Sequence, residues 1–151
     1  MLQMINKIID GICEKLNESF GDGYEIYTEL KNQDLKEPCF SVMCVNPISN
    51  QVLGNRYFRN NLFSILYFPS SKEPKAECNA VLESLYLALE TITIKEKLLD
   101  ATVKESLVMG TNMRGELVDD VLNFLVNFNM FVYKVEDADL MEEMIQQSEL
   151  K

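Results

Sequence analysis

The chain has 151 residues, 47% of them hydrophobic and 25% charged, with a formal net charge of −10 at neutral pH. This length suits one domain that buries a core without disulfides or metals. The absence of histidine excludes Ser-His-Asp and Cys-His catalysis and His-ligated zinc, although carboxylate or lysine chemistry stays open. Because there is no Lys/Arg cluster and no apolar run of bilayer length, we expect neither sequence-specific nucleic-acid binding nor a membrane span.

The first half of the chain predicts one helix followed by three strands. Residues 4–20 place apolar side chains at helical spacing, and Gly21-Asp22-Gly23 ends this helix. The three strands are predicted at residues 24–28, 39–45 and 57–68. Asn46-Pro47 closes the second strand, a loop runs through Gly54, and Pro69 stops the third. We expect these strands to form an antiparallel meander.

The second half predicts a second amphipathic helix and more strands. Ser71 is a candidate cap for this helix and Pro74 lies in its first turn. Its apolar stripe consists of Cys78, Val81, Leu82, Leu85, Ala88 and Leu89. Residues 91–94 and 101–109 are predicted strands around the charged Lys95-Glu96-Lys97, and Gly110-Thr111-Asn112 is a predicted turn.

A short C-terminal helix is predicted at residues 138–147, with Leu140, Met141, Met144 and Ile145 on one side. Acidic residues crowd its N-terminal end, where the helix dipole favours them. The whole chain, residues 1–151, is therefore expected to be a single α+β domain. It should contain a mostly antiparallel sheet packed by two amphipathic helices, plus this short C-terminal helix.

The cysteines and the N-terminus suggest a reduced compartment. Cys13, Cys39, Cys44 and Cys78 lack C-x-x-C spacing and lie among apolar residues, so we interpret them as buried, reduced thiols. The N-terminus lacks the pattern of a secretory signal. We therefore expect no metal and no cofactor, and a protein that works in the cytosol where it is made or leaves by lysis.

The most informative segment is residues 121–135. Leu122, Phe124, Val126, Phe128, Met130 and Val132 occupy every second position. This alternation favours a half-buried strand, although a helix also fits the first half. An unbroken strand of this length would span about 50 Å, more than the diameter of about 40 Å expected for a domain of this size. It must therefore either bend near Asn127–Asn129 or reach a neighbouring subunit.

Charged residues just before this segment allow a functional and a structural interpretation. Arg114 and Glu116 could form a salt bridge between subunits, or could be a solvated surface pair. Asp119-Asp120 could bind a divalent cation, but adjacent strand residues point to opposite faces, so we do not expect one metal to take both. The interface hypothesis from this region comprises Arg114, Glu116, Phe124, Phe128, Phe131 and Tyr133.

The segment MRGELVDDVLNFLVNFNMFV also resembles the C-terminal signature of a phage tail terminator family of Firmicutes prophages and contractile tail-like bacteriocins. The matching residues are Met113, Arg114, Glu116, Asp119 or Asp120, Leu122, Phe124, Asn127, Phe128 and Phe131. The order and length of the predicted elements are similar to the family as well. The acidic pair at 119–120 departs from the Asp-Gly expected there.

The resemblance implies a structural subunit of a homo-hexameric ring on the head-proximal end of a tail tube, in a virion or tail-like particle assembled in the bacterial cytoplasm. Its implied partners are the tail tube protein, the sheath and neck or collar proteins, and no catalytic residue is implied. Three alternatives remain: a head–tail joining or collar protein, a small assembly chaperone, and a carboxylate-dependent hydrolase using Asp119, Asp120 or Glu116.

Overall fold

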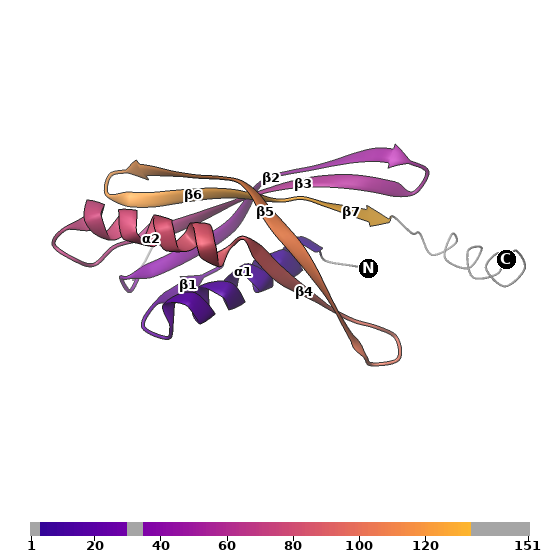
Figure 1. Ribbon diagram of the computed structural model, residues 1–151, viewed down its shortest axis with the longest axis horizontal. Coiled ribbons are helices and arrows are strands. Elements are labelled where there is room, and N and C mark those ends of the chain that lie inside the picture. The colour runs from indigo at the N-terminus through magenta and orange to yellow at the C-terminus, as the bar shows by residue number, and fades with distance from the viewer. Residues whose placement is uncertain (1–3, 30–34, 134–151) are drawn as a thin grey trace, which may run out of the picture.

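The computed structural model describes residues 4–29 and 35–133, which form a sheet with two helices against it (Figure 1). The helices are α1 (Met4–Phe20) and α2 (Pro74–Ala88). The strands are β1 (Glu25–Tyr27), β2 (Cys39–Leu53), β3 (Arg56–Phe68), β4 (Thr91–Lys97), β5 (Val103–Val118), β6 (Val121–Phe128) and β7 (Met130–Tyr133). The order in the sheet is β1-β2-β3-β6-β5-β4, with β7 beside β3.

This architecture confirms the predicted α+β class with a mostly antiparallel sheet and two amphipathic helices. The helix predicted at residues 138–147 lies outside the described residues. The first pair of the expected meander is wrong, because β1 runs parallel to β2. The 11 residues between the two strands leave room for the chain to return to the same end of the sheet before β2 begins.

Both helices lie on one face of the sheet, and the hydrophobic core fills the space between them and it (Figure 1). The helices contribute Ile8, Ile12, Leu16, Cys78, Val81 and Leu85. The sheet contributes the alternate residues Phe40, Val42, Phe63, Ile65, Tyr67, Leu122, Phe124 and Val126. Each of the larger side chains contributes about 1.5–3 kcal/mol by leaving water. No described helix covers the opposite face of the sheet.

The ends of both helices follow from local chemistry. Gly21 has a φ of 83° and its N–H donates to the Asn17 carbonyl at 2.9 Å, which closes α1 as predicted. At the start of α2 the cap position belongs to Glu73 and not to Ser71. The Ser71 hydroxyl instead accepts a hydrogen bond from the Glu73 N–H at 3.2 Å, so it orders the turn before the helix.

The second strand is more than twice as long as predicted. Asn46 and Pro47 do not end β2, which continues to Leu53 and pairs with β3 down to Arg56. A bulge at Val45 precedes the proline. Among the described strands, β2 has β1 beside it only at its first three residues, so Pro47 lies where the other edge is free. A missing N–H costs no ladder hydrogen bond at a free edge, which is why the proline is tolerated.

The fifth strand also continues through a predicted turn. Gly110, Thr111 and Asn112 lie inside β5, and a register shift between Thr111 and Arg114 replaces the expected reversal. Asn112 has a φ of 52° in this bulge. The chain reverses instead at Asp119 and Asp120, with φ values of 51° and 62°, so the expectation that this pair lies on a strand is wrong. Two positive φ values are typical of a two-residue hairpin turn.

The long strand predicted at residues 121–135 is divided by Asn129 into β6 and β7, and both pair with β3. Asn61 of β3 lies opposite the interruption. Its side-chain Nδ2 donates to the Phe128 carbonyl and its N–H donates to Asn129 Oδ1, both at 3.1 Å. Both strands keep the same register along β3, so the described residues show an interruption at Asn129 and no turn, and contact of this segment with a neighbouring subunit stays a prediction.

Candidate subunit interface

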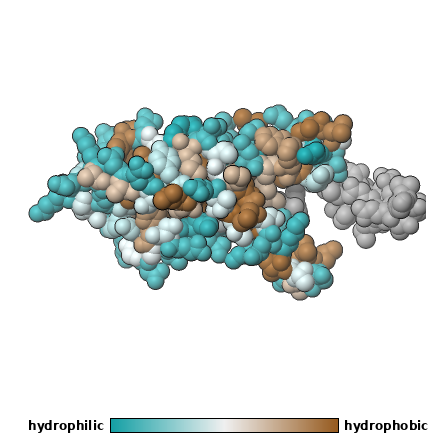
Figure 2. Space-filling model, in the orientation of Figure 1, coloured by the Kyte–Doolittle hydropathy of each residue, from teal (hydrophilic) through white to brown (hydrophobic). Residues whose placement is uncertain are grey.

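Two hairpins extend beyond the helices and diverge from each other (Figure 1). We call residues 46–61 of β2 and β3, together with β7, the arm. The hairpin of β4 and the first half of β5, residues 91–109, is the wing. Figure 2 shows apolar residues at the far ends of both. Exposed apolar area concentrated in this way marks sites of interaction with other proteins.

The arm is a three-stranded ribbon with an aromatic face. Phe58 of β3 and Phe131 of β7 are register partners, and their ring centroids lie 4.8 Å apart. The Arg56 guanidinium carbon lies 4.0 Å from the centroid of the Phe131 ring, a cation–π contact. Tyr133, the partner of Arg56, is 64% exposed, and Leu53 near the tip is 78% exposed.

The arm also has two free strand edges within the described part of the chain. Beyond Ser41, β2 pairs only with β3, and β7 likewise pairs only with β3. Unpaired backbone groups on such edges are ready to extend a sheet into another chain. In contrast, the outer edge of β4 is protected by α1: Gly11 lies against the Thr93 carbonyl, and Lys7 Nζ donates to the Lys95 carbonyl at 3.2 Å.

The wing presents leucines on an ordered turn. Leu99 at its tip is fully exposed, and Leu107 and Met109 further along β5 are 73% and 67% exposed. The turn is held by the Asp100 carboxylate, which accepts hydrogen bonds from the Thr102 hydroxyl at 2.6 Å and its N–H at 3.1 Å. These bonds hold the pKa of the Asp100 carboxyl below its usual value. An ordered turn reduces the entropy lost when its side chains bind a partner.

The residues of the interface hypothesis lie in two different environments. Phe124 and Phe128 are fully buried on the core face of β6, so their side chains offer no area to a second chain. Phe131 and Tyr133 lie on the exposed face of the arm. Arg114 and Glu116 are exposed on β5, on the sheet face that the described helices leave free.

Arg114 and Glu116 are not paired to each other among the described ion pairs, and Arg114 Nη1 donates to the Asn112 carbonyl at 3.1 Å. Both side chains therefore keep charged groups directed away from the core. The sequence predicted strands at residues 91–94 and 101–109, which both lie in the wing, but it ended the first strand before residues 95–97 and did not predict that the hairpin projects beyond the helices. The signal for the wing was the adjacent pair Leu98-Leu99 between charged residues, which no core periodicity explains.

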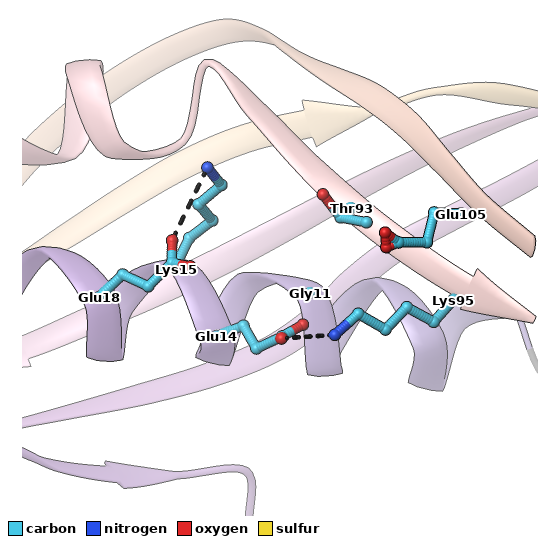
Figure 3. Close-up of a pocket in the computed structure, with 7 residues that line it drawn as sticks. All are labelled: Gly11, Glu14, Lys15, Glu18, Thr93, Lys95 and Glu105. Atoms are coloured by element: carbon cyan, nitrogen blue, oxygen red, sulfur yellow. Dashed lines mark hydrogen bonds and ion pairs between the residues drawn. The ribbon is translucent and has the colours of Figure 1, made fainter. Parts of the chain in front are cut away.

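A charged hollow of about 180 Å³ lies between α1 and the wing (Figure 3). Lys95 of β4 reaches across it to Glu14 of α1 at 2.9 Å, and Lys15 pairs with Glu18 at 3.8 Å. The remaining lining residues are Gly11, Thr93 and Glu105. The half-exposed Lys95–Glu14 pair joins the wing to α1, and exposed pairs contribute little free energy.

Neither the Asp119-Asp120 pair nor the cysteines lie in surroundings that suit metal binding or nucleophilic chemistry. Asp119 and Asp120 form the exposed turn between β5 and β6, and no group of three His, Cys, Asp or Glu side chains within residues 4–29 and 35–133 could hold a metal ion. Burial, and then the Asp10 carboxylate, raise the pKa of the Cys13 thiol to about 11. Burial also raises the pKa of Cys39, Cys44 and Cys78. Thiols with raised pKa values are protonated at neutral pH and are weak nucleophiles.

Comparison with known proteins gives one finding about the family. A family model described as "Phage tail terminator protein" matches residues 7–139, which include all of the described strands and most of α1. No curated protein matches the chain. No helix in the described part of the chain is long and apolar enough to cross a membrane.

Proposed function

The chain belongs to the phage tail terminator family, and on that premise we propose that it forms a ring on the head-proximal end of a tail tube. A structural role in phage tail assembly follows from the family itself. The proposal adds that the ring stops growth of the tube and joins it to neck, collar or sheath proteins. Within this function the protein acts by binding and not by catalysis.

The observation that carries the proposal is the pair of different projections on one chain. A ring of identical subunits needs two unlike surfaces, one on each side of the subunit, that fit each other. The arm offers free strand edges and aromatic side chains, whereas the wing offers leucines on an ordered turn. A heterologous contact between such surfaces closes into a ring when the rotation between neighbours divides a full circle. We propose six subunits.

The exposed members of the interface hypothesis fit this arrangement. Phe131 and Tyr133 lie on the arm, where a neighbour would cover their rings. Arg114 and Glu116 lie on the uncovered face of the sheet, where they can pair with charges of a neighbour or of the tube. Phe124 and Phe128 support the same surface from the core side, because they hold β6 against the helices.

The tube end and the neck side would each meet a different face of the ring. A tube grows because each layer exposes an unsatisfied face, so a subunit that stops growth must bind that face and present another. The net charge of −10 also suits a passage for DNA, since acidic surfaces do not hold phosphates. We propose the tail tube protein, the sheath and a neck or collar protein as partners in a contractile particle.

Three measurements test this function. Purified full-length protein should form a ring-sized oligomer by light scattering, and particles made without it should have tails of irregular, excessive length in negative stain. Mass spectrometry of finished wild-type particles should detect the chain. Tails of normal length and closure in its absence would contradict the proposal, and absence of the chain from finished particles would instead support an assembly chaperone.

A further inference from the structure

The charges of this acidic chain are unevenly distributed. No acidic residue occurs between Pro38 and Lys72, or between Val121 and Val135, so the arm contains none. Its charged residues are Arg56 and Arg59. In contrast, residues 134–151, which follow the arm directly, contain six acidic residues and two lysines. The chain therefore places its most acidic segment directly after an acid-free surface that carries two arginines.

The exposed face of the arm is suited to an amphipathic, acidic ligand. Ile48, Phe131 and Tyr133 are 43%, 48% and 64% exposed on the arm, and Arg56 lies over the Phe131 ring. The Nε atom of Arg56 is buried and has no hydrogen-bond partner among the described residues. A carboxylate beside this guanidinium would form a charge-assisted hydrogen bond with its accessible N–H groups.

We propose that residues 134–151 of one subunit dock on the arm of a neighbouring subunit. This inference rests on the proposed ring, and it names the segment and the surface that meet. The sequence pattern of residues 138–147 places Leu140, Met141, Met144 and Ile145 on one side of a helix, with Glu142 and Glu143 beside them.

Contact between neighbours, rather than within one chain, follows from where the arm ends. Tyr133 pairs with Arg56 next to the β2–β3 turn, so the chain leaves the arm at its far tip. Docking on its own arm would require a reversal within Lys134–Asp137, immediately before the predicted helix. Docking on a neighbour requires no such reversal, and the remaining 18 residues can span at most about 60 Å.

Charge exchange in the full-length protein tests the contact. Arg56→Glu alone, and Glu142→Lys with Glu143→Lys in a second variant, should each raise the dissociation constant for self-association about tenfold or more, measured by light scattering across a dilution series. An equimolar mixture of the two variants should recover wild-type association, because each arm then meets a tail of opposite charge. Lys75→Glu makes the same charge change on exposed α2 and should leave association unchanged.

The outcomes separate this inference from the proposed function. If wild-type protein forms the ring and both variants do so with unchanged affinity, the tail–arm contact is wrong while the ring stands. If each variant is weakened but their mixture is not restored, the charges act within one chain, which also overturns the contact between neighbours. If the wild-type chain stays monomeric at every concentration, the proposed ring fails first. Circular dichroism melts establish that each variant is folded.

Discussion

The Tyr67 hydroxyl of β3 donates a hydrogen bond to the Glu77 carboxylate of α2, joining the centre of the sheet to the first turn of the helix. The same carboxylate accepts hydrogen bonds from the N–H groups of Ser70 at 3.2 Å and Ser71 at 2.8 Å. One side chain therefore fixes the loop that leads from β3 into α2. Burial, and then the hydrogen bond to Glu77, raise the pKa of Tyr67 far above its ordinary value, so it remains a donor.

Glu77→Gln should destabilise the fold by about 1–3 kcal/mol at neutral pH, because an amide NH₂ would face donors that need an acceptor. Burial alone would raise the pKa of the Glu77 carboxyl, but hydrogen bonds from Tyr67, Ser70 and Ser71 hold it below its usual value. Its contribution is therefore complete above the unfolded pKa and is lost as the pH falls through the folded pKa. Urea unfolding at several pH values measures this.

The difference between wild type and Glu77→Gln should accordingly shrink toward acid pH. Glu83→Gln, an exposed change on the same helix, is the control and should stay within about 0.5 kcal/mol of wild type. A gap that stays constant from neutral to strongly acid pH would show that the carboxylate charge has no part in the contact.

Gly110 lies where β5 leaves β6 to join β4, and this divergence should not tolerate a side chain. A Cβ at this position would lie 2.3 Å from the Leu89 carbonyl oxygen and 2.8 Å from Met113 Cε. Since the nearest atom belongs to the backbone, it cannot rotate away. Gly110→Ala should therefore lower the free energy of unfolding by about 3 kcal/mol, the upper end of the range for overpacking.

Alanine substitutions at two other glycines serve as controls for Gly110→Ala. Gly115→Ala would meet the Leu82 side chain at 2.7 Å, which can change rotamer, so its cost should be smaller. Gly23→Ala meets nothing within 4 Å and should be close to neutral. Equal melting temperatures for Gly110→Ala and Gly23→Ala would rule out the tight approach between the β5 backbone and the end of α2.

A substitution in the turn between β5 and β6 should increase the stability of the protein. Asp119 and Asp120 both adopt positive φ, where a side chain is strained and glycine is not. Asp120→Gly should stabilise the protein by about 0.5–1 kcal/mol, and it keeps the Asp120 carbonyl that accepts from Cys78 Sγ at 3.8 Å. Glu116→Gly within β5 should instead cost about 0.5–1 kcal/mol. Chemical denaturation that ranks the two variants in the reverse order would refute this account of the turn.

Some elements of this fold are determined by the local sequence pattern and can be predicted from it, whereas others depend on tertiary contacts. The helices and the core strands follow from the spacing of apolar residues in the sequence. Phe63, Ile65 and Tyr67, for example, alternate along β3 and lie on one face of it. The continuation of β2 beyond Asn46 and of β5 beyond Met109 could not be predicted from this spacing. Proline and glycine usually end strands. Pro47 does not, because it lies at a free edge, and Gly110 does not, because another part of the backbone approaches it closely. Both conditions depend on the tertiary structure.

The candidate interface could likewise be predicted only in part from the sequence. Alternation separates Phe124 and Phe128, which face the core, from Phe131, which faces solvent, because β6 and β7 keep one register along β3 across Asn129. Alternation does not tell whether the solvent-facing side meets another chain. The two strands of the wing were predicted, but their projection beyond the helices was not, because its leucines pack against no core and a strand pattern shows which face is covered only when one face is buried. Side chains that pack against no core of their own chain leave a weak periodic signal in its sequence.

The two phenylalanines on either side of Asn129 should therefore respond differently to truncation. Phe128→Ala removes a fully buried ring that packs against Phe63, with centroids 6.1 Å apart, and should cost about 3–5 kcal/mol of stability. Phe131→Ala removes a half-exposed ring and should cost the isolated subunit only about 1 kcal/mol, the value of its contact with Phe58. Its main effect should be on assembly, with self-association weakened about tenfold.

Leu87→Ala supplies the control for exposed apolar area, because Leu87 is 73% exposed on α2, away from the arm. It should change neither stability nor association. Urea unfolding measures the first quantity, and light scattering at matched concentrations measures the second. If Phe131→Ala associated as wild type does while Leu87→Ala dissociated, the contact surface would lie over the helices. The arm would then be a structural extension of the sheet and no interface.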